Sequence, residues 1–204
     1  MATEAPSVGP FEAIVLAAGS GSRFGGGKLL APWRGGVLLD GALAAAFAAP
    51  ARSVILATGA QGDLVGIAAR RLARRMGEDE RLRIVAVADH AEGMGASLRA
   101  AAASLPADAA GVFVVLGDMP RAPVAVLAPM AAAVRAGAPA AAPRFNGRRG
   151  NPVLLGAGLI PALTGLSGDT GAREILAGLG DRLALVDAPD DGVLFDVDRR
   201  EDLG

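Results

Sequence analysis

The apolar residues of this chain gather into short continuous runs, and longer Ala-rich segments lie between the runs. Four runs have the length and composition of buried strands, at residues 11–17, 54–57, 83–87 and 112–116. Three Ala-rich segments between them are long enough for helices, at residues 40–49, 62–76 and 95–104. A repeated order of strand, helix and strand predicts an α/β fold with a mostly parallel sheet and helices on both faces.

Pro and Gly break the second half of the chain into shorter elements. We expect helices at 123–136, 157–163 and 171–179, and strands at 138–142, 152–155 and 183–186, with a further strand at 193–197 behind the last of these. No linker or repeat divides the chain, so the sequence predicts one Rossmann-like domain over residues 11–204. Residues 1–10 are expected to form a flexible tail.

The composition supports a buried core and argues against several kinds of partner. The 204 residues are 52% apolar and carry a formal charge of −1, which suits one globular domain. Charges of both signs are interspersed and aromatic residues make up only 3%, so nucleic acid is not an expected partner. The chain has no cysteine, no basic leader and no run long enough to span a membrane, so we expect a cytoplasmic protein without membrane contact.

A glycine-rich loop follows the first expected strand and carries two cations. Residues 19–27 read Gly-Ser-Gly-Ser-Arg-Phe-Gly-Gly-Gly, and Lys28 comes directly after them. Lys28 is the only lysine among the twenty basic residues, and the others are arginines. Glycines allow backbone N–H groups to approach an anion, and Arg23 and Lys28 add charge, so the loop predicts a polyphosphate site. The alternative is a glycine turn with two solvated cations.

Two well-known phosphate loops do not match this segment. A Walker A loop fails because Ser22 holds its first glycine position and Leu29 follows Lys28. A dinucleotide fingerprint fails because the glycines are spaced Gly-x-Gly-x-x-x-Gly, and because Thr58 stands where the ribose-binding acid would close the second strand. A Rossmann oxidoreductase is therefore disfavoured.

Carboxylates follow the fourth strand and recur near the C-terminus. Asp118 emerges from a buried strand beside the expected polyphosphate, where it would bind Mg²⁺, although it could instead cap a helix. Asp196 and Asp198 would lie on one face of a strand, so either could complete the metal site. Their alternative role is to cap a short helix that begins near Glu201.

The other polar side chains give weaker indications. His90 is the only histidine, and without cysteine it cannot belong to a catalytic triad, so we interpret it as a solvated loop residue. The basic segment 144–150 suits a phosphate-bearing acceptor or a closing loop, but it could equally be a solvated hairpin tip.

Six motifs resemble, in order, those of the MobA-like nucleotidyltransferases that act on molybdenum cofactor. They lie at residues 15–28, 93–99, 117–120, 150–153, 168–173 and 196–203 and span nearly the whole chain. The cytidylyl branch of the family is the nearer one, because Ala18 stands where guanylyl relatives carry Gly and because Gly-Asp-x-Gly-Ala-Arg is more typical of that branch. Two departures are Asn151, where many cytidylyltransferases have His, and Arg199-Arg200, where Thr-Pro is usual.

The resemblance implies roles for particular residues. Nucleotide binding would fall to Leu16, Ala17, Ala18, Gly19, Gly21, Arg23, Lys28, Thr58, Gly93 and Ser97. Arg23, Lys28 and Asp118 would be catalytic, and Mg²⁺ would be held by Asp118 and, in preference to Asp196, by Asp198. Acceptor contacts would come from Asn151, Asp169 and Arg173.

The resemblance also implies a reaction. CMP would pass from CTP to the phosphate of molybdenum cofactor, a phosphorylated pterin, with release of pyrophosphate, and a molybdoenzyme could receive the product. No protein nucleophile is needed, because the acceptor phosphate is already ionised near neutral pH. The alternatives are guanylyl transfer from GTP, transfer to another small phosphorylated acceptor, or a cofactor carrier without catalysis. Paired Mg²⁺ ligands argue against the carrier.

Overall fold

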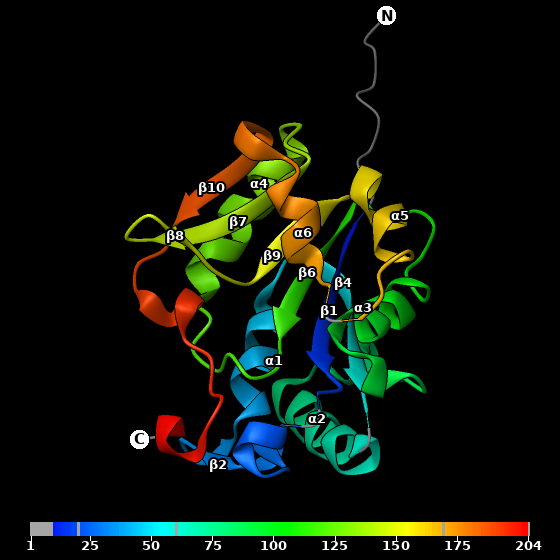
Figure 1. Ribbon diagram of the computed structural model, residues 1–204, viewed down its shortest axis with the longest axis vertical. Coiled ribbons are helices and arrows are strands. Elements are labelled where there is room, and N and C mark those ends of the chain that lie inside the picture. The colour runs from blue at the N-terminus through cyan, green and yellow to red at the C-terminus, as the bar shows by residue number, and fades with distance from the viewer. Residues whose placement is uncertain (1–9, 20, 60, 169, 204) are drawn as a thin grey trace, which may run out of the picture.

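The computed structural model describes residues 10–19, 21–59, 61–168 and 170–203, so nearly all of the expected N-terminal tail lies outside the described residues. The main sheet has eight strands: β1 (Phe11–Ala17), β4 (Ala51–Thr58), β5 (Leu82–Ala86), β6 (Gly111–Leu116), β7 (Ala140–Phe145), β8 (Arg148–Arg149), β9 (Val153–Gly156) and β10 (Leu183–Asp187). Their order is β10-β7-β9-β6-β1-β4-β5, and β8 pairs with β7 (Figure 1). A small antiparallel hairpin, β2 (Pro32–Trp33) with β3 (Gly36–Val37), was not expected from the sequence.

Most neighbouring strands run in the same direction. β1 is parallel to β4 and β6, β5 is parallel to β4, and β10 is parallel to β7. β9 is antiparallel to both β6 and β7. The expected mostly parallel sheet is confirmed, and the carboxyl ends of β1, β4, β5 and β6 meet at one edge, where ligands bind in open α/β sheets.

Helices cover both faces of the sheet, as the sequence predicts. The α-helices are α1 (Leu39–Ala48), α2 (Gly62–Met76), α3 (Met94–Ala102), α4 (Leu127–Arg135), α5 (Ile160–Leu163) and α6 (Ala172–Ala177). α1, α2 and α4 contribute to one apolar cluster, and α3, α5 and α6 to the other. Alternate β1 residues divide between them, with Val15 in the first cluster and Ile14 in the second, as the period of two in a strand requires.

Short 3₁₀ helices occupy many of the connections. They are η1 (Ser22–Phe24), η2 (Lys28–Leu30), η3 (Asp79–Arg81), η4 (His90–Glu92), η5 (Val124–Val126), η6 (Ala157–Leu159), η7 (Gly180–Arg182), η8 (Asp191–Leu194) and η9 (Arg200–Leu203). Among the described residues, no helix has both the length and the apolar character needed to cross a membrane.

One predicted strand is wrong, and the alternative role of Asp118 as a helix cap is not found. Residues 193–197 form no strand: Val193 and Val197 are buried, but their backbone bonds go to loops, from Asn151 N–H to the Val193 carbonyl and from Val197 N–H to the Asp118 carbonyl. Asp118 also begins no helix, because a turn follows it and the next helical segment is η5. The apolar residues at 193–197 therefore reflect burial rather than strand pairing.

A buried acid ties the strands together near their amino ends. Glu12, on β1, is fully buried and accepts hydrogen bonds from Ser53 N–H and Oγ at 3.0 and 2.5 Å. Arg52 Nε donates to Glu12 at 2.7 Å, and its two terminal nitrogens bind Asp108 at 2.9 and 2.8 Å. Every buried polar side-chain atom among the described residues has a partner, so this charge is compensated.

Candidate active site

The glycine loop after β1 turns sharply and delivers Lys28 to the carboxyl edge of the sheet. Gly25, Gly26 and Gly27 have φ values of 88°, 90° and 65°, in the left-handed region that favours glycine. The carbonyl of Gly21 accepts hydrogen bonds from the N–H groups of Phe24 and Gly26. The expected use of glycine for positive φ is confirmed, and η2 begins at Lys28 directly after the turn.

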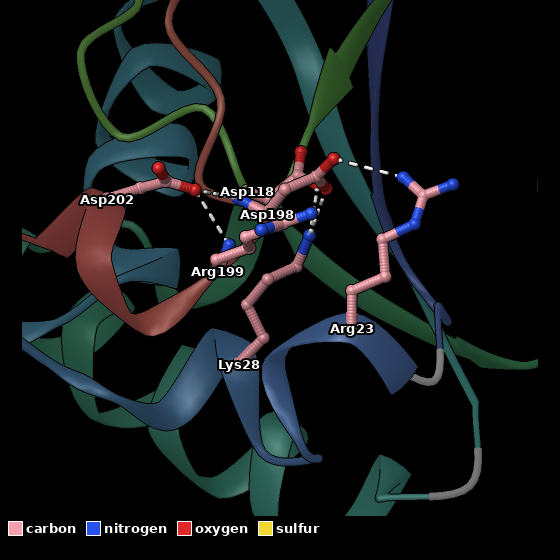
Figure 2. A network of polar contacts seen from close by, with 6 residues as sticks. All are labelled: Arg23, Lys28, Asp118, Asp198, Arg199 and Asp202. Carbon is pink, nitrogen blue, oxygen red and sulfur yellow. Dashed lines mark hydrogen bonds and ion pairs between the residues drawn. The ribbon is translucent and has the colours of Figure 1, made fainter.

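Four charged side chains from distant parts of the chain meet beside this loop (Figure 2). Lys28 Nζ lies 2.6 Å from Asp118 Oδ2 and 3.6 Å from Asp198 Oδ1. Arg23 Nη1 lies 3.2 Å from Asp198 Oδ2. The Lys28 side chain is only 13% exposed, whereas that of Arg23 is 75% exposed. The two acids that the sequence singles out therefore converge on one buried ammonium group.

The C-terminal segment is fixed in place by hydrogen bonds on both sides of Asp198. Val197 N–H donates to the Asp118 carbonyl at 3.1 Å. The Asp202 carboxylate accepts from the N–H groups of Asp198 and Arg199 at 2.9 and 2.7 Å (Figure 2). The bonds from Arg199 and Asp198 lower the pKa of Asp202 below its ordinary value. Asp202 thus caps the start of η9, a role that the sequence offered to Asp196 or Asp198.

A cavity of about 620 Å³ opens at this point. Most of the predicted nucleotide-binding residues line it: Leu16, Ala17, Ala18, Gly19, Gly21, Lys28, Gly93 and Ser97, together with Asp118 and Asp198. Arg23 and Thr58 are not among its lining residues. The Arg23 side chain is 75% exposed. The Thr58 side chain is buried, and its hydroxyl donates to the Val85 carbonyl at 3.4 Å, because Thr58 is the last residue of β4.

His90 opens η4, is half-buried and lines the same cavity with Ala91 and Met94. Its interpretation as a solvated loop residue stays a prediction. The sequence feature that could have indicated this place in the cavity is the position of His90 shortly before Gly93, between a strand and the helix that follows it.

A second cavity, of about 970 Å³, adjoins the first. The two share four lining residues: Leu16, Met94, Leu116 and Asp196. Asn151 and Arg173 line the second cavity, as do Arg148 and Arg149 of the basic segment, while Asp169 lies outside the described residues. Three arginines, Arg148, Arg149 and Arg173, thus line the second cavity, whose other lining residues are mostly apolar.

Asp196 stands at the junction of the two cavities. Asp196 is exposed to solvent as a whole residue, but its carboxyl group is partly buried. This partial burial, together with the negative charges of Asp118 and Asp198, raises the pKa of Asp196 above its ordinary value. The sequence left Asp196 and Asp198 open as metal ligands. Of these two acids, only Asp198 forms ion pairs with Lys28 and Arg23 in the part of the chain that the structure describes.

The donor set fits a hard divalent cation shared with a substrate. Asp118 and Asp198 offer carboxylate oxygens at the cavity wall, and Mg²⁺ is commonly held by one or two carboxylates with phosphate oxygens and water. Among the described residues, no group of three or more His, Cys, Asp or Glu side chains is placed to hold a metal by itself. The site therefore suits a metal that arrives with phosphates.

Comparison with known proteins identifies related sequences. A model of the MobA-like NTP transferase domain matches residues 13–184. Nicotine blue oxidoreductase of Paenarthrobacter nicotinovorans is 32% identical over 93% of both chains. Molybdenum cofactor cytidylyltransferase of Escherichia coli K12 is 27% identical over 94% of this chain and 92% of that protein.

Solved structures share the fold. Rv0371c of Mycobacterium tuberculosis H37Rv superposes with a TM-score of 0.76 at 26% identity, over 96% of both chains. The structure of Rv0371c in complex with manganese gives a TM-score of 0.69 at 24% identity, over 89% of both chains.

Proposed function

The chain belongs to the family of MobA-like NTP transferase domains, and we propose that it transfers CMP from CTP to the phosphate of molybdenum cofactor in a Mg²⁺-dependent reaction that releases pyrophosphate. The family supports nucleotidyl transfer, and the name of the Escherichia coli relative supports the finer assignment. The observation that carries the proposal is the convergence of Asp118 and Asp198 on Lys28, in the wall of a cavity that glycines of the loop also line.

The charged residues in and beside the first cavity divide into phosphate-binding and metal-binding groups. Lys28 and Arg23 bind the triphosphate and neutralise the charge that builds on departing pyrophosphate. Asp118 and Asp198 would hold Mg²⁺, which when bound neutralises phosphate oxygens near the reacting phosphorus. A manganese complex of Rv0371c is consistent with a divalent cation in this fold.

The second cavity receives the acceptor. Arg148, Arg149 and Arg173 suit an anionic group, and the apolar wall suits a flat ring system. Because the two cavities meet at Asp196, the acceptor phosphate can face the α-phosphate of the nucleotide across this junction. An acceptor oxygen then bonds to the α-phosphorus, the bond to the bridging oxygen breaks, and pyrophosphate leaves with the electron pair.

The choice of CTP rests on the first motif and on the cytidylyl relative. Ala18 lines the nucleotide cavity at the position where guanylyl relatives carry Gly. Guanylyl transfer from GTP and transfer to another phosphorylated acceptor are the competing assignments, and delivery of the product to a molybdoenzyme remains part of the same proposal.

Pyrophosphate release tests the assignment. The protein is incubated with Mg²⁺ and molybdenum cofactor, and CTP and GTP are offered separately. Release with CTP alone supports cytidylyl transfer, and release with GTP moves the protein to the guanylyl branch. If neither nucleotide reacts but CTP with Mg²⁺ raises the melting temperature, the acceptor is wrong. Binding of the finished dinucleotide cofactor without turnover would instead favour a carrier.

A second candidate is an oxidation–reduction reaction, because the relative at 32% identity is named an oxidoreductase. The departures from the dinucleotide fingerprint disfavour it. The test is to mix the protein with nicotine blue and NADH or NADPH and to follow the colour of the dye. Enzymatic bleaching without any nucleotidyl transfer would replace the first proposal with this one.

A further inference from the structure

The only lysine of the chain makes contact with both acids proposed to bind the metal. Lys28 Nζ is 2.6 Å from Asp118 Oδ2 and 3.6 Å from Asp198 Oδ1. The second oxygen of Asp198 is paired with Arg23 at 3.2 Å. Three of the four carboxylate oxygens thus face a protein cation (Figure 2), so a metal ion that binds both acids competes with Lys28 for them.

The choice of lysine matters because its charge is compact. An ammonium group is a compact point charge on a flexible stem, whereas guanidinium is a broad planar fork with its charge delocalised over three nitrogens. Lys28 is 13% exposed and Asp118 is 26% exposed, so their attraction is less screened by water than that of the 75% exposed Arg23. Lys28 is therefore the stronger competitor for a metal at these acids.

We propose that Lys28 is an internal counter-cation that occupies Asp118 and Asp198 until a nucleoside triphosphate draws it away, so that nucleotide and divalent metal bind cooperatively. The inference rests on the proposed function for the identity of the ligands. Phosphate oxygens pair with Lys28 and Arg23, and Asp118 and Asp198 become available to the metal in the same step. By linkage, a metal ion that displaces Lys28 from the acids also frees the charge of Lys28 to bind the phosphates.

Metal binding without nucleotide tests the inference. Lys28→Met shortens the unbranched side chain by one atom and removes its charge, and we expect the variant to bind Mn²⁺ about tenfold more tightly than the unaltered protein does, within the usual range of coupling between sites. Free Mn²⁺ is measured by electron paramagnetic resonance, and melting curves check that the variant is folded. Equal or weaker Mn²⁺ binding by folded Lys28→Met overturns the inference.

A matched control separates a direct contact from net charge. Arg199 adjoins Asp198 in the sequence, but its side chain pairs with Glu201. Arg199→Met changes the net charge by the same amount and breaks neither pair with Lys28, so we expect Mn²⁺ affinity close to that of the unaltered protein. An increase as large as that of Lys28→Met would show that general repulsion of the cation, rather than displacement of Lys28, limits metal binding.

A second measurement needs no variant. Because Lys28 is the only lysine, its acylation by an amine-reactive reagent can be followed by mass spectrometry, with the N-terminal amine as internal reference. Saturating Mn²⁺ alone should speed acylation of Lys28, and inorganic tripolyphosphate alone should slow it. An unchanged rate at saturating Mn²⁺ overturns the inference. Both measurements omit CTP and acceptor, so failure of cytidylyl transfer leaves their outcome interpretable.

Discussion

Asp202 holds the backbone of Asp198 by a hydrogen bond of 2.9 Å from the Asp198 N–H group to the Asp202 carboxylate. The same carboxylate accepts the neighbouring Arg199 N–H at 2.7 Å. Within the described part of the chain, Asp202 forms no ion pair with Lys28 or Arg23. It is therefore a positioning residue, which fixes one acid of the site through the main chain.

Replacing Asp202 should weaken metal use more than nucleotide binding. In Asp202→Ala the two N–H groups lose their acceptor and Asp198 loses its fixed direction, so we expect a rise of about tenfold or more in the Mg²⁺ concentration needed for turnover, the scale seen when outer partners of metal ligands are lost. Asp202→Asn retains an accepting oxygen and should restore most of the function. Equal loss in both variants would contradict the positioning role.

Asp118 should be essential for turnover and dispensable for folding. Asp118→Asn removes a charge directed into the cavity, and we expect pyrophosphate release to fall by about a hundredfold or more, the scale of losing a preorganised electrostatic group. The melting temperature should change little, because the side chain lies at the cavity wall. Asp181→Asn, on the exposed surface, serves as control. Unchanged turnover in Asp118→Asn removes this residue from the mechanism.

Lys28 should govern the nucleotide concentration that the enzyme requires. In Lys28→Ala the phosphates lose a partly buried cation, so we expect the KM for CTP to rise by about tenfold or more, as for loss of a charge-assisted contact. Initial rates over a range of CTP concentrations measure this. An unaltered dependence on CTP would count against phosphate binding by Lys28.

Glu12 should matter for stability alone. Glu12→Gln replaces a fully buried acceptor with a group that also carries hydrogen donors, facing Arg52 and Ser53. We expect the free energy of unfolding to fall by about 1–3 kcal/mol, the cost of a mismatched buried hydrogen bond. Urea unfolding measures the loss. Turnover of the folded variant should be normal, and a large loss of turnover would link this end of the sheet to the site.

Asp108 should contribute to stability in a pH-dependent way. Its hydrogen bond with Arg52 lowers its pKa below the ordinary value of 3.8 that it has in an unfolded chain. The pair therefore stabilises the folded state fully above that ordinary value, and the contribution is lost as the pH falls through the lowered pKa. Asp108→Asn should melt below the unaltered protein at neutral pH, and the difference should vanish in strong acid. A difference independent of pH would contradict this account.

The sequence predicts elements best where local signals delimit them. β1 and α2 begin and end at the predicted residues, since β1 is followed by Ala18-Gly19 of the glycine-rich segment and α2 is followed by Gly77, which has φ 73°. The strand predicted at 193–197 is wrong because a short apolar run looks the same whether the segment pairs with a strand or is buried under loops. The antiparallel direction of β9 has no local signal either, because strand direction depends on partners distant in sequence.

The candidate site is predictable in its chemistry but not in its contacts. Glycines and charges after strands locate Lys28 and Asp118, because the carboxyl ends of parallel strands share an edge. The second strand is predicted to end at residue 57, whereas β4 includes Thr58, whose side chain is buried. The cap formed by Asp202 and the place of His90 depend on how loops fold back, which residue types alone do not determine.

The hydrogen bond from Val197 N–H to the Asp118 carbonyl has a consequence for synthesis of the protein. Asp118 and Asp198 are separated by the whole second half of the sheet, and they meet only when the C-terminal segment docks. A nascent chain on the ribosome therefore cannot assemble the pair until the segment that carries Asp198 has emerged. Any product cut short before that point would lack the second acid, so synthesis of this segment governs when the site can first bind a metal.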